Sequence, residues 1–177
     1  MLRFFVTTRL FSSSSSRPAA PRAPLFRIAL PPCNLLFANE GEMIDHLKTN
    51  PPISFPVFVG SNIFFGAHGS RLGLDVEIDI IFANNELEEK LLAVEVKHVS
   101  THAQRFKQRR KSKGQAIIAS QLCAETFGKS SLGGVFSSES PHEISIWSEF
   151  VMHTPRLCKE HNLIEVKGKR EWVYFSK

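Results

Sequence analysis

The sequence predicts one α/β domain that follows an N-terminal targeting segment. Two stretches, Leu74–Phe82 and Leu91–Val99, alternate between apolar and polar residues as half-buried strands do. Two other stretches, Glu40–Lys48 and His102–Phe127, carry residues that pack at helical spacing. Gly128 is the expected stop of the second helix, and Gly114 is a candidate interruption within it. Residues 1–39 contain no acidic residue. We therefore expect a folded domain over residues 39–177 and a disordered leader over residues 1–38.

The leader has the composition of an organellar transit peptide. It combines a run of serines, Ser12–Ser16, with five arginines: Arg3, Arg9, Arg17, Arg22 and Arg27. Such a segment predicts import into the mitochondrial matrix, with the plastid as the alternative, although a basic tail that binds nucleic acid has a similar composition. Without these five arginines, the 22 Lys+Arg fall to 17, equal to the 17 Asp+Glu, so the domain itself is near neutral.

The other elements follow from turn residues and alternation. No stretch is long and apolar enough to span a membrane, so no membrane partner is expected. The three cysteines form no CxxC pair, which argues against a disulfide framework or structural zinc. In chain order, strands are expected at Phe55–Val59, Ile63–Phe65, Leu74–Phe82, Leu91–Val99, Gly133–Ser137, Glu143–Trp147, Leu163–Val166 and Trp172–Phe175, with turns at Gly60–Asn62 and Asn84–Lys90 and a loop at Gly66–Gly73.

The two alternating strands carry charged residues that chemistry can use. Glu95 and Lys97 are two residues apart and therefore project from one face of their strand. If the strands form an antiparallel hairpin, Asp79 can lie beside them. Carboxylates on a largely apolar sheet need a cation, and Mg²⁺ accepts one or two carboxylates plus water and phosphate oxygens. The pattern indicates a metal site at Asp79 and Glu95, with Lys97 placed to orient a water or stabilise a transition state.

These residues resemble the core of the PD-(D/E)XK nuclease superfamily. Glu77-Ile78-Asp79-Ile80-Ile81 followed by Leu92-Ala93-Val94-Glu95-Val96-Lys97 is most similar to archaeal-type Holliday-junction resolvases and to YraN-like proteins. The resemblance spans Glu40 to Phe127 and implies a restriction-endonuclease-like mixed sheet flanked by helices. It implies that Asp79 and Glu95 bind Mg²⁺ or Mn²⁺ and that Lys97 assists the attacking water. It also implies a Glu on the preceding helix, with Glu42 preferred and Glu40 in reserve, and a Gln on the following helix, for which Gln115 is the match.

A cluster of cations follows the second strand. Six of nine residues are basic: Arg105, Lys107, Arg109, Arg110, Lys111 and Lys113. In a near-neutral domain such a cluster predicts a local patch for phosphate contact, although a solvated helix face has the same composition. We expect the aromatic residues, by contrast, to build the core and not to stack on bases; these are Trp147, Trp172, Tyr174 and the phenylalanines.

Three functions are consistent with these patterns. The first is a mitochondrial metal-dependent nuclease that hydrolyses phosphodiester bonds, with DNA expected ahead of RNA and branched DNA as a candidate substrate. The second is a noncatalytic nucleic-acid-binding or assembly factor that keeps the nuclease fold. The third is a subunit of an organellar complex whose charges are structural. A resolvase-like role would imply a homodimer, because symmetric cuts need two sites.

Overall fold

The computed structural model contains a mixed sheet with one helix on each face. It describes residues 23–32, 36–65, 76–87 and 89–152, and the backbones of two further strands, 162–166 and 171–175. The elements are β1 (Phe26–Ala29), α1 (Glu40–Thr49), β2 (Val57–Phe65), β3 (Val76–Ala83), β4 (Lys90–Lys97), α2 (His102–Phe127), β5 (Ser130–Ser137), β6 (Glu143–Phe150), β7 (Asn162–Val166) and β8 (Glu171–Phe175). The expected α/β class is confirmed.

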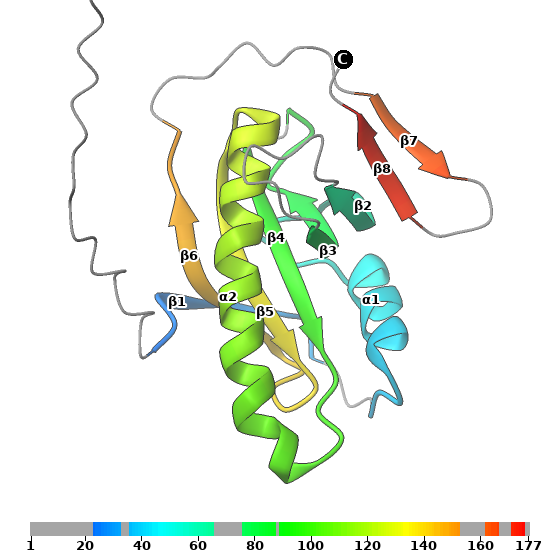
Figure 1. The fold of residues 1–177 in the computed structure, drawn as a ribbon, viewed down its shortest axis with the longest axis vertical. Helices are drawn as coiled ribbons and strands as arrows, with labels where there is room; N and C mark the ends of the chain where they lie inside the picture. The colour runs from blue at the N-terminus through cyan, green and yellow to red at the C-terminus, as the bar shows by residue number, and fades with distance from the viewer. Residues whose placement is uncertain are drawn as a thin grey trace, which may run out of the picture.

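The strand order is β1-β6-β5-β4-β3-β2-β8-β7. The β3–β4 pair is the antiparallel hairpin that the alternation predicted, and Ile80 lies opposite Val94. β5 runs parallel to β4 because α2 carries the chain back across the sheet (Figure 1). The β7–β8 hairpin was also predicted, and β8 adds to the sheet through a parallel pairing with β2.

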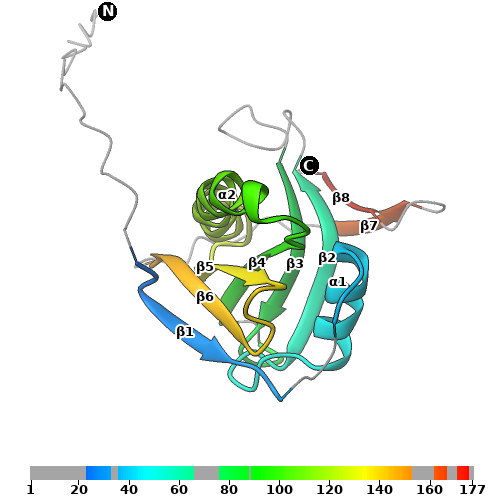
Figure 2. The same cartoon turned by 90° about the horizontal axis from the view of Figure 1, so that it is seen from below.

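Two apolar layers hold the helices on opposite faces of the sheet (Figure 2). One face packs Met43, Ile44 and Leu47 of α1 against strand residues such as Val94 and Val96. The other face packs α2 against a second set of strand residues: Ala119, Leu122 and Cys123 contact Ile81, Ala83, Leu91 and Ala93. Because side chains alternate along β4, Glu95 belongs to the face that α2 covers.

Helix α2 lies very close to the sheet at one point. A Cβ on Gly133 of β5 would clash with the carbonyl oxygen of Ala116 and with Ser148 Oγ. Only glycine therefore allows α2 to approach β5 at this depth. At the end of the helix Gly128 has φ 66°, the left-handed conformation of a helix C-cap, which matches the predicted stop. Gly114 does not interrupt the helix.

Two sequence-based expectations were wrong. Phe55–Val59 and Ile63–Phe65 are not separate strands around a turn, because β2 runs continuously through Gly60, which pairs with Ile81. The irregularity in its pairing with β3 lies just before, between Phe58 and Gly60. Phe26–Ala29 lies in the segment assigned to the disordered leader, but it forms β1 and pairs antiparallel with β6. Ile28 and Leu30 are buried in the core, so the folded part begins before residue 39. The expected loop at Gly66–Gly73 lies outside the described residues.

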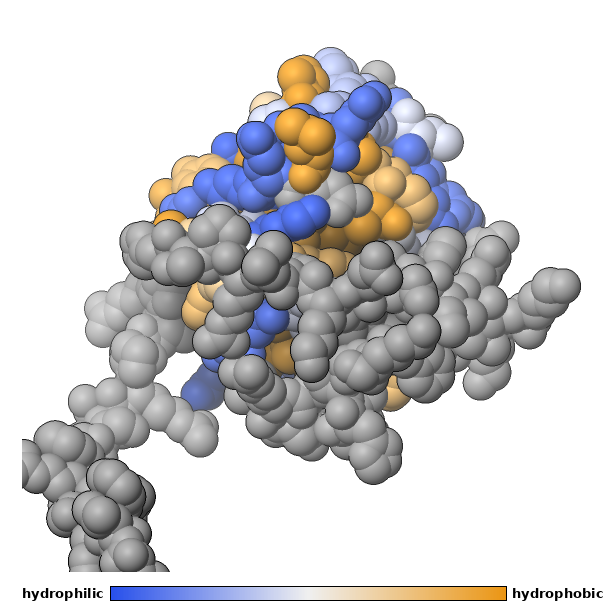
Figure 3. Space-filling model, turned by 90° about the horizontal axis from the view of Figure 1, so that it is seen from above, coloured by the Kyte–Doolittle hydropathy of each residue, from blue (hydrophilic) through white to orange (hydrophobic). Residues whose placement is uncertain are grey.

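Apolar residues that remain on the surface are scattered among polar ones. Figure 3 shows this mixture on the end of the molecule seen from above. The large apolar residues that are exposed come from separate elements and turns: Leu25, Phe26, Leu36, Ile53, Phe58, Phe64, Leu87 and Val151. No helix in the described part of the chain has the length and apolarity needed to span a membrane.

Candidate active site

The charged residues of β3 and β4 meet in one pocket. Asp79, Glu95 and Lys97 line a cavity of 310 Å³ together with Glu40 from α1, Gln115 and Ile118 from α2, and Glu77 and Val76 from β3. Asp79 and Glu95 come together because they are one step beyond the Ile80–Val94 pair, and directly opposed residues of an antiparallel pair face the same way. A neighbouring cavity of 290 Å³ on the side of α1 shares Glu40, Glu77 and Asp79 with this pocket.

Glu95 is the most buried acid of the pocket. It is 2% exposed, and its Oε1 lies 2.9 Å from Lys97 Nζ. Burial raises the pKa of Glu95, while the hydrogen bond and the charge of Lys97 oppose that rise. Burial alone would lower the pKa of Lys97, but the ion pair with Glu95 and the charges of Asp79 and Glu40 outweigh it, so the pKa of Lys97 is raised. Lys97 is therefore an ammonium at neutral pH and not a proton acceptor.

Asp79 holds a second carboxylate beside Glu95. Burial, followed by repulsion from Glu95, raises the pKa of Asp79 to about 7. Its Oδ2 accepts a 2.6 Å hydrogen bond from the backbone N–H of Val96, which favours the ionised form and limits the rise. The pocket thus holds two acids whose pKa values are raised chiefly by burial, and such a cluster of perturbed acids marks a candidate functional site.

The glutamate of α1 that lines the pocket is Glu40, and not Glu42, which the resemblance favoured. Glu40 Oε1 lies 3.4 Å from Lys97 Nζ and accepts a 3.4 Å hydrogen bond from the backbone N–H of His98. Glu42 is engaged at the start of α1, where its Oε2 accepts a 2.8 Å bond from Ala38 N–H. Asn39 Oδ1 accepts from Glu42 N–H in return, as in a capping box. The structure therefore brings Glu40 into the pocket and turns Glu42 away from it.

Gln115 carries an acceptor with no partner among the described residues. Its Oε1 is buried and makes no hydrogen bond, although buried polar atoms are almost always paired. Lys111, one turn earlier on α2, lies close enough to Glu95 to lower its pKa. Gln115 and Lys111 therefore belong to a helix face that is directed toward the carboxylates.

The basic cluster of α2 divides into two groups. Arg105 and Arg109 both pair with Glu139, the latter at 3.2 Å, and Lys113 Nζ lies 3.9 Å from the ring centroid of Trp147. The remaining cations, Lys107, Arg110 and Lys111, are exposed. The structure thus leaves about half of the predicted patch open to solvent beside the pocket, and it binds the other half to β5–β6.

The residues of the pocket have the chemistry that a divalent ion requires. Asp79 and Glu95 supply two carboxylates, and Gln115 supplies an unpaired amide oxygen, all of which are hard ligands. No three His, Cys, Asp or Glu side chains within the described ranges are gathered as a ready ligand set. A metal here would complete its shell with water and would compete with Lys97 for Glu95.

The sequence also missed residues of the pocket. Glu77 lines it because it precedes Asp79 by two residues and so shares its face of β3, a signal that the alternation carried. Trp147 was expected in the core but is half-buried beside Lys113.

Comparisons with protein-family models, with curated proteins and with solved structures found no match.

Proposed function

We propose that this protein is a metal-dependent nuclease of the PD-(D/E)XK type, with a restriction-endonuclease-like domain, that hydrolyses phosphodiester bonds of DNA in the mitochondrial matrix. The observation that carries the proposal is the convergence of Asp79, Glu95 and Lys97 with Glu40 and Gln115 on one 310 Å³ pocket. Asp79 and the Glu95-x-Lys97 pair come from β3 and β4. Glu40 of α1 and Gln115 of α2 line the same pocket from two further elements.

The side chains have distinct roles in this proposal. Asp79 and Glu95 hold Mg²⁺ or Mn²⁺, and Gln115 Oε1 binds the ion or accepts a hydrogen bond from its water. When bound, the ion supplies an acidified water and neutralises charge on the phosphate. Lys97, held by Glu95 and Glu40, keeps its proton and donates a hydrogen bond to the attacking water or to a non-bridging phosphate oxygen.

The exposed cations support the choice of substrate. Lys107, Arg110 and Lys111 lie on α2, which walls the pocket, and contacts from them to phosphates would guide a nucleic acid toward the carboxylates. Such contacts carry no sequence information, so selectivity would come from the shape of the substrate. Residues 1–22, which lie outside the described ranges, would direct import.

The direct test is cleavage of labelled substrates with Mg²⁺ or Mn²⁺. Duplex, four-way junction and single-stranded DNA are offered with matched RNA. Cleavage that disappears in Asp79→Ala and Lys97→Ala, and persists in Lys90→Ala on the far end of β4, supports the nuclease. Failure of the purified full chain to cut any of them with either metal refutes it.

A second candidate is a noncatalytic nucleic-acid-binding or assembly factor with the same fold. The observation that favours it is the Lys97 ammonium, which already lies between Glu95 and Glu40 and so neutralises part of the charge that a metal would meet. In that case nucleic acid binds, EDTA has no effect on binding, and neutralising Lys107, Arg110 and Lys111 abolishes it.

A further inference from the structure

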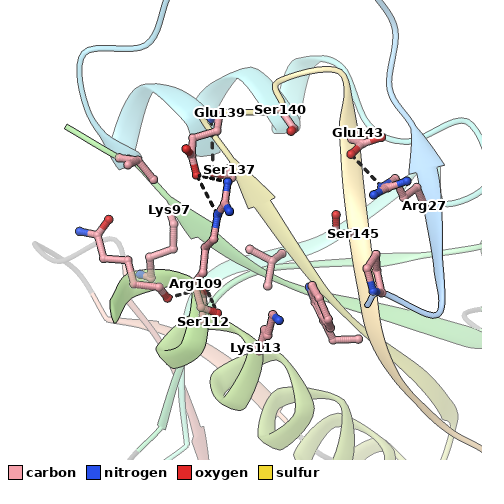
Figure 4. Close-up of a pocket in the computed structure, with 15 residues that line it drawn as sticks. Arg27, Lys97, Arg109, Ser112, Lys113, Ser137, Glu139, Ser140, Glu143 and Ser145 are labelled. Atoms are coloured by element: carbon pink, nitrogen blue, oxygen red, sulfur yellow. Dashed lines mark hydrogen bonds and ion pairs between the residues drawn. The ribbon is translucent and has the colours of Figure 1, made fainter. Parts of the chain in front are cut away.

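A second pocket lies beside the carboxylates, on the other side of Lys97. It has a volume of 320 Å³ and lies between α2 and strands β5, β6 and β1 (Figure 4). Lys97 lines both this pocket and the carboxylate pocket, so the two hollows adjoin at its side chain. The second pocket contains none of the proposed metal ligands, Asp79 and Glu95.

The register of the sheet sets the distance between the two pockets. A single row of directly paired residues crosses four strands, from Glu95 to Val135, then Ser145, then Arg27. Glu95 lies in the first pocket, and the other three residues line the second. With strands about 4.8 Å apart, Arg27 lies about 14 Å from Glu95 across the sheet. The residues of this row that line the second pocket therefore lie from about 5 Å (Val135) to about 14 Å (Arg27) from Glu95. Since stacked nucleotides are about 3.4 Å apart, the pocket would receive a nucleotide within about four positions of the cleaved bond.

The pocket offers a planar surface for a base. Trp147 is half-buried, and one face of its ring is covered by Lys113, whose Nζ lies 3.9 Å from the ring centroid. Lysine is a flexible side chain that can move off the ring and meet a phosphate, whereas the indole is fixed by β6. A base that replaced the ammonium would keep a partner on the indole face.

The charges of the pocket suit an anionic ligand. Four cations line it, Arg27, Lys97, Arg109 and Lys113, against the two acids Glu139 and Glu143. The acids hold the guanidiniums in place: Arg27 Nε lies 3.0 Å from Glu143, and Arg109 lies 3.2 Å from Glu139. The hydroxyls of Ser140 and Ser145 add hydrogen-bonding groups that could reach a sugar or a base edge (Figure 4).

We infer that this pocket binds one unstacked nucleotide of a single-stranded segment, within a few positions of the bond that the carboxylate site would cut, with its base on Trp147 and its phosphate between Lys113 and Arg109. The inference rests on the proposed nuclease function and narrows its substrate class. Bases of an intact duplex are stacked on one another and cannot lie on an indole, so the pocket selects strands that are unpaired, frayed or branched.

The experiment measures binding in EDTA, where no cut can occur. Tryptophan fluorescence of the full chain is followed while a short single-stranded oligonucleotide, the matching duplex or a poly-glutamate peptide is added. Quenching by the single strand is expected, with at least tenfold weaker binding of the duplex and no effect of the peptide. Single-stranded DNA and RNA are compared as separate arms.

Variants assign the signal to the pocket. Because both Trp147 variants remove the fluorophore, their affinity is measured by the fluorescence anisotropy of a dye-labelled single strand. Trp147→Leu should weaken single-strand binding by about 5- to 100-fold, the equivalent of one lost stacking contact, and Trp147→Phe should keep most of it. Trp172→Phe removes the other tryptophan as a matched control and should leave the quenching intact. Ser145→Phe fills the pocket from the floor without changing Trp147, and it should weaken binding even if Trp147→Leu fails to fold.

The inference and the proposed function fail in different ways. Unchanged single-strand affinity in Ser145→Phe and in folded Trp147→Leu overturns the inference, as does equal quenching by duplex or peptide. Cleavage that depends on Asp79 but is indifferent to Trp147 also refutes the pocket while supporting the nuclease. Trp147-dependent binding with no cleavage in either metal supports the pocket and refutes the nuclease.

Discussion

Asp79 of β3 accepts a 2.6 Å hydrogen bond from the backbone N–H of Val96, the residue between Glu95 and Lys97 on β4. This bond ties the isolated acid of one strand to the acid–lysine pair of the next. It explains how two carboxylates that repel each other remain on neighbouring strands, because an amide donor offsets part of the cost of burying Asp79.

The charge of Asp79 should make the protein less stable at alkaline pH. Its folded-state pKa of about 7 lies above the ordinary 3.8, so the folded state binds the proton more tightly than the unfolded state. Stability from this group is therefore complete below about pH 4 and is lost as the pH rises through 7. Asp79→Asn should raise the free energy of unfolding at pH 8 by up to about 4 kcal/mol and change it little at pH 4. Urea unfolding at both pH values, in EDTA, measures this, and an equal effect at both would contradict it.

Removing the ammonium of Lys97 should destabilise the protein strongly. Lys97→Met leaves Glu95 buried and ionisable without its partner, at an expected cost of about 3 kcal/mol at pH 8. The control is Lys90→Met, which breaks the exposed pair with Glu149 and should cost less than about 1 kcal/mol. Mg²⁺ at millimolar concentration should restore part of the loss in Lys97→Met by replacing the missing charge. Equal thermal shifts for the two variants would argue against a buried pair.

Glu40 and Glu42 should behave differently although they are two residues apart. Glu40→Gln removes a carboxylate from the pocket, so it should lower cleavage or Mn²⁺ affinity at least tenfold with little effect on stability. Glu42→Gln alters only the start of α1 and should cost about 0.5–1 kcal/mol without changing metal affinity. Calorimetric titration of Mn²⁺ and urea unfolding separate the two effects, and a reversed order would restore Glu42 as the site residue.

The N-terminal boundary can be tested by truncation. A chain that starts at residue 23 keeps β1, whereas one that starts at residue 39 loses Ile28 and Leu30 from the core. Each buried aliphatic side chain contributes about 1.5–3 kcal/mol, so the shorter chain should be at least about 3 kcal/mol less stable. It also exposes the edge of β6, which should promote aggregation. Equal melting temperatures for the two chains would show that β1 is dispensable.

Alanine substitutions at Gly133 and Gly114 should change the free energy of unfolding in opposite directions. Gly133→Ala forces a Cβ against the backbone of α2 and should cost at least about 1–3 kcal/mol. Gly114→Ala has nothing within 4 Å of the new Cβ and lies inside α2, so it should stabilise by about 0.5–1 kcal/mol. Thermal unfolding of both variants checks the contact, and a neutral Gly133→Ala would show that the helix can withdraw.

The sequence predicted those parts of the fold that depend on local signals. Alternation located β3 and β4, and Gly128 marked the end of α2, because each signal acts within a few residues. β1 was missed because the strand it pairs with, β6, begins more than 110 residues later, and its own composition is that of a leader. Gly60–Asn62 was interpreted as a turn because composition cannot distinguish a turn from a continuous strand with an irregularity beside a glycine.

The candidate site was predictable to a similar degree. Asp79, Glu95 and Lys97 were placed together because strand periodicity fixes which residues share a face. The structure places Glu40 in the pocket and not Glu42, which was preferred. Asn39 and Glu42 have the spacing of a capping box, a sequence signal that would have assigned Glu42 to the helix end. The position of Trp147 depends on how α2 lies across β5 and β6, and no local pattern encodes that.

Helix α2 is common to both hollows. Gln115 and Ile118 line one of them, and Gln108, Arg109, Ser112 and Lys113 line the other. Because a helix rises 1.5 Å per residue, Gln108 and Gln115 are about 10 Å apart along its axis. Because Gly133 lets α2 pack closely against the sheet, the helix holds the two pockets at a fixed separation. A bound strand would have to match that separation to occupy both pockets.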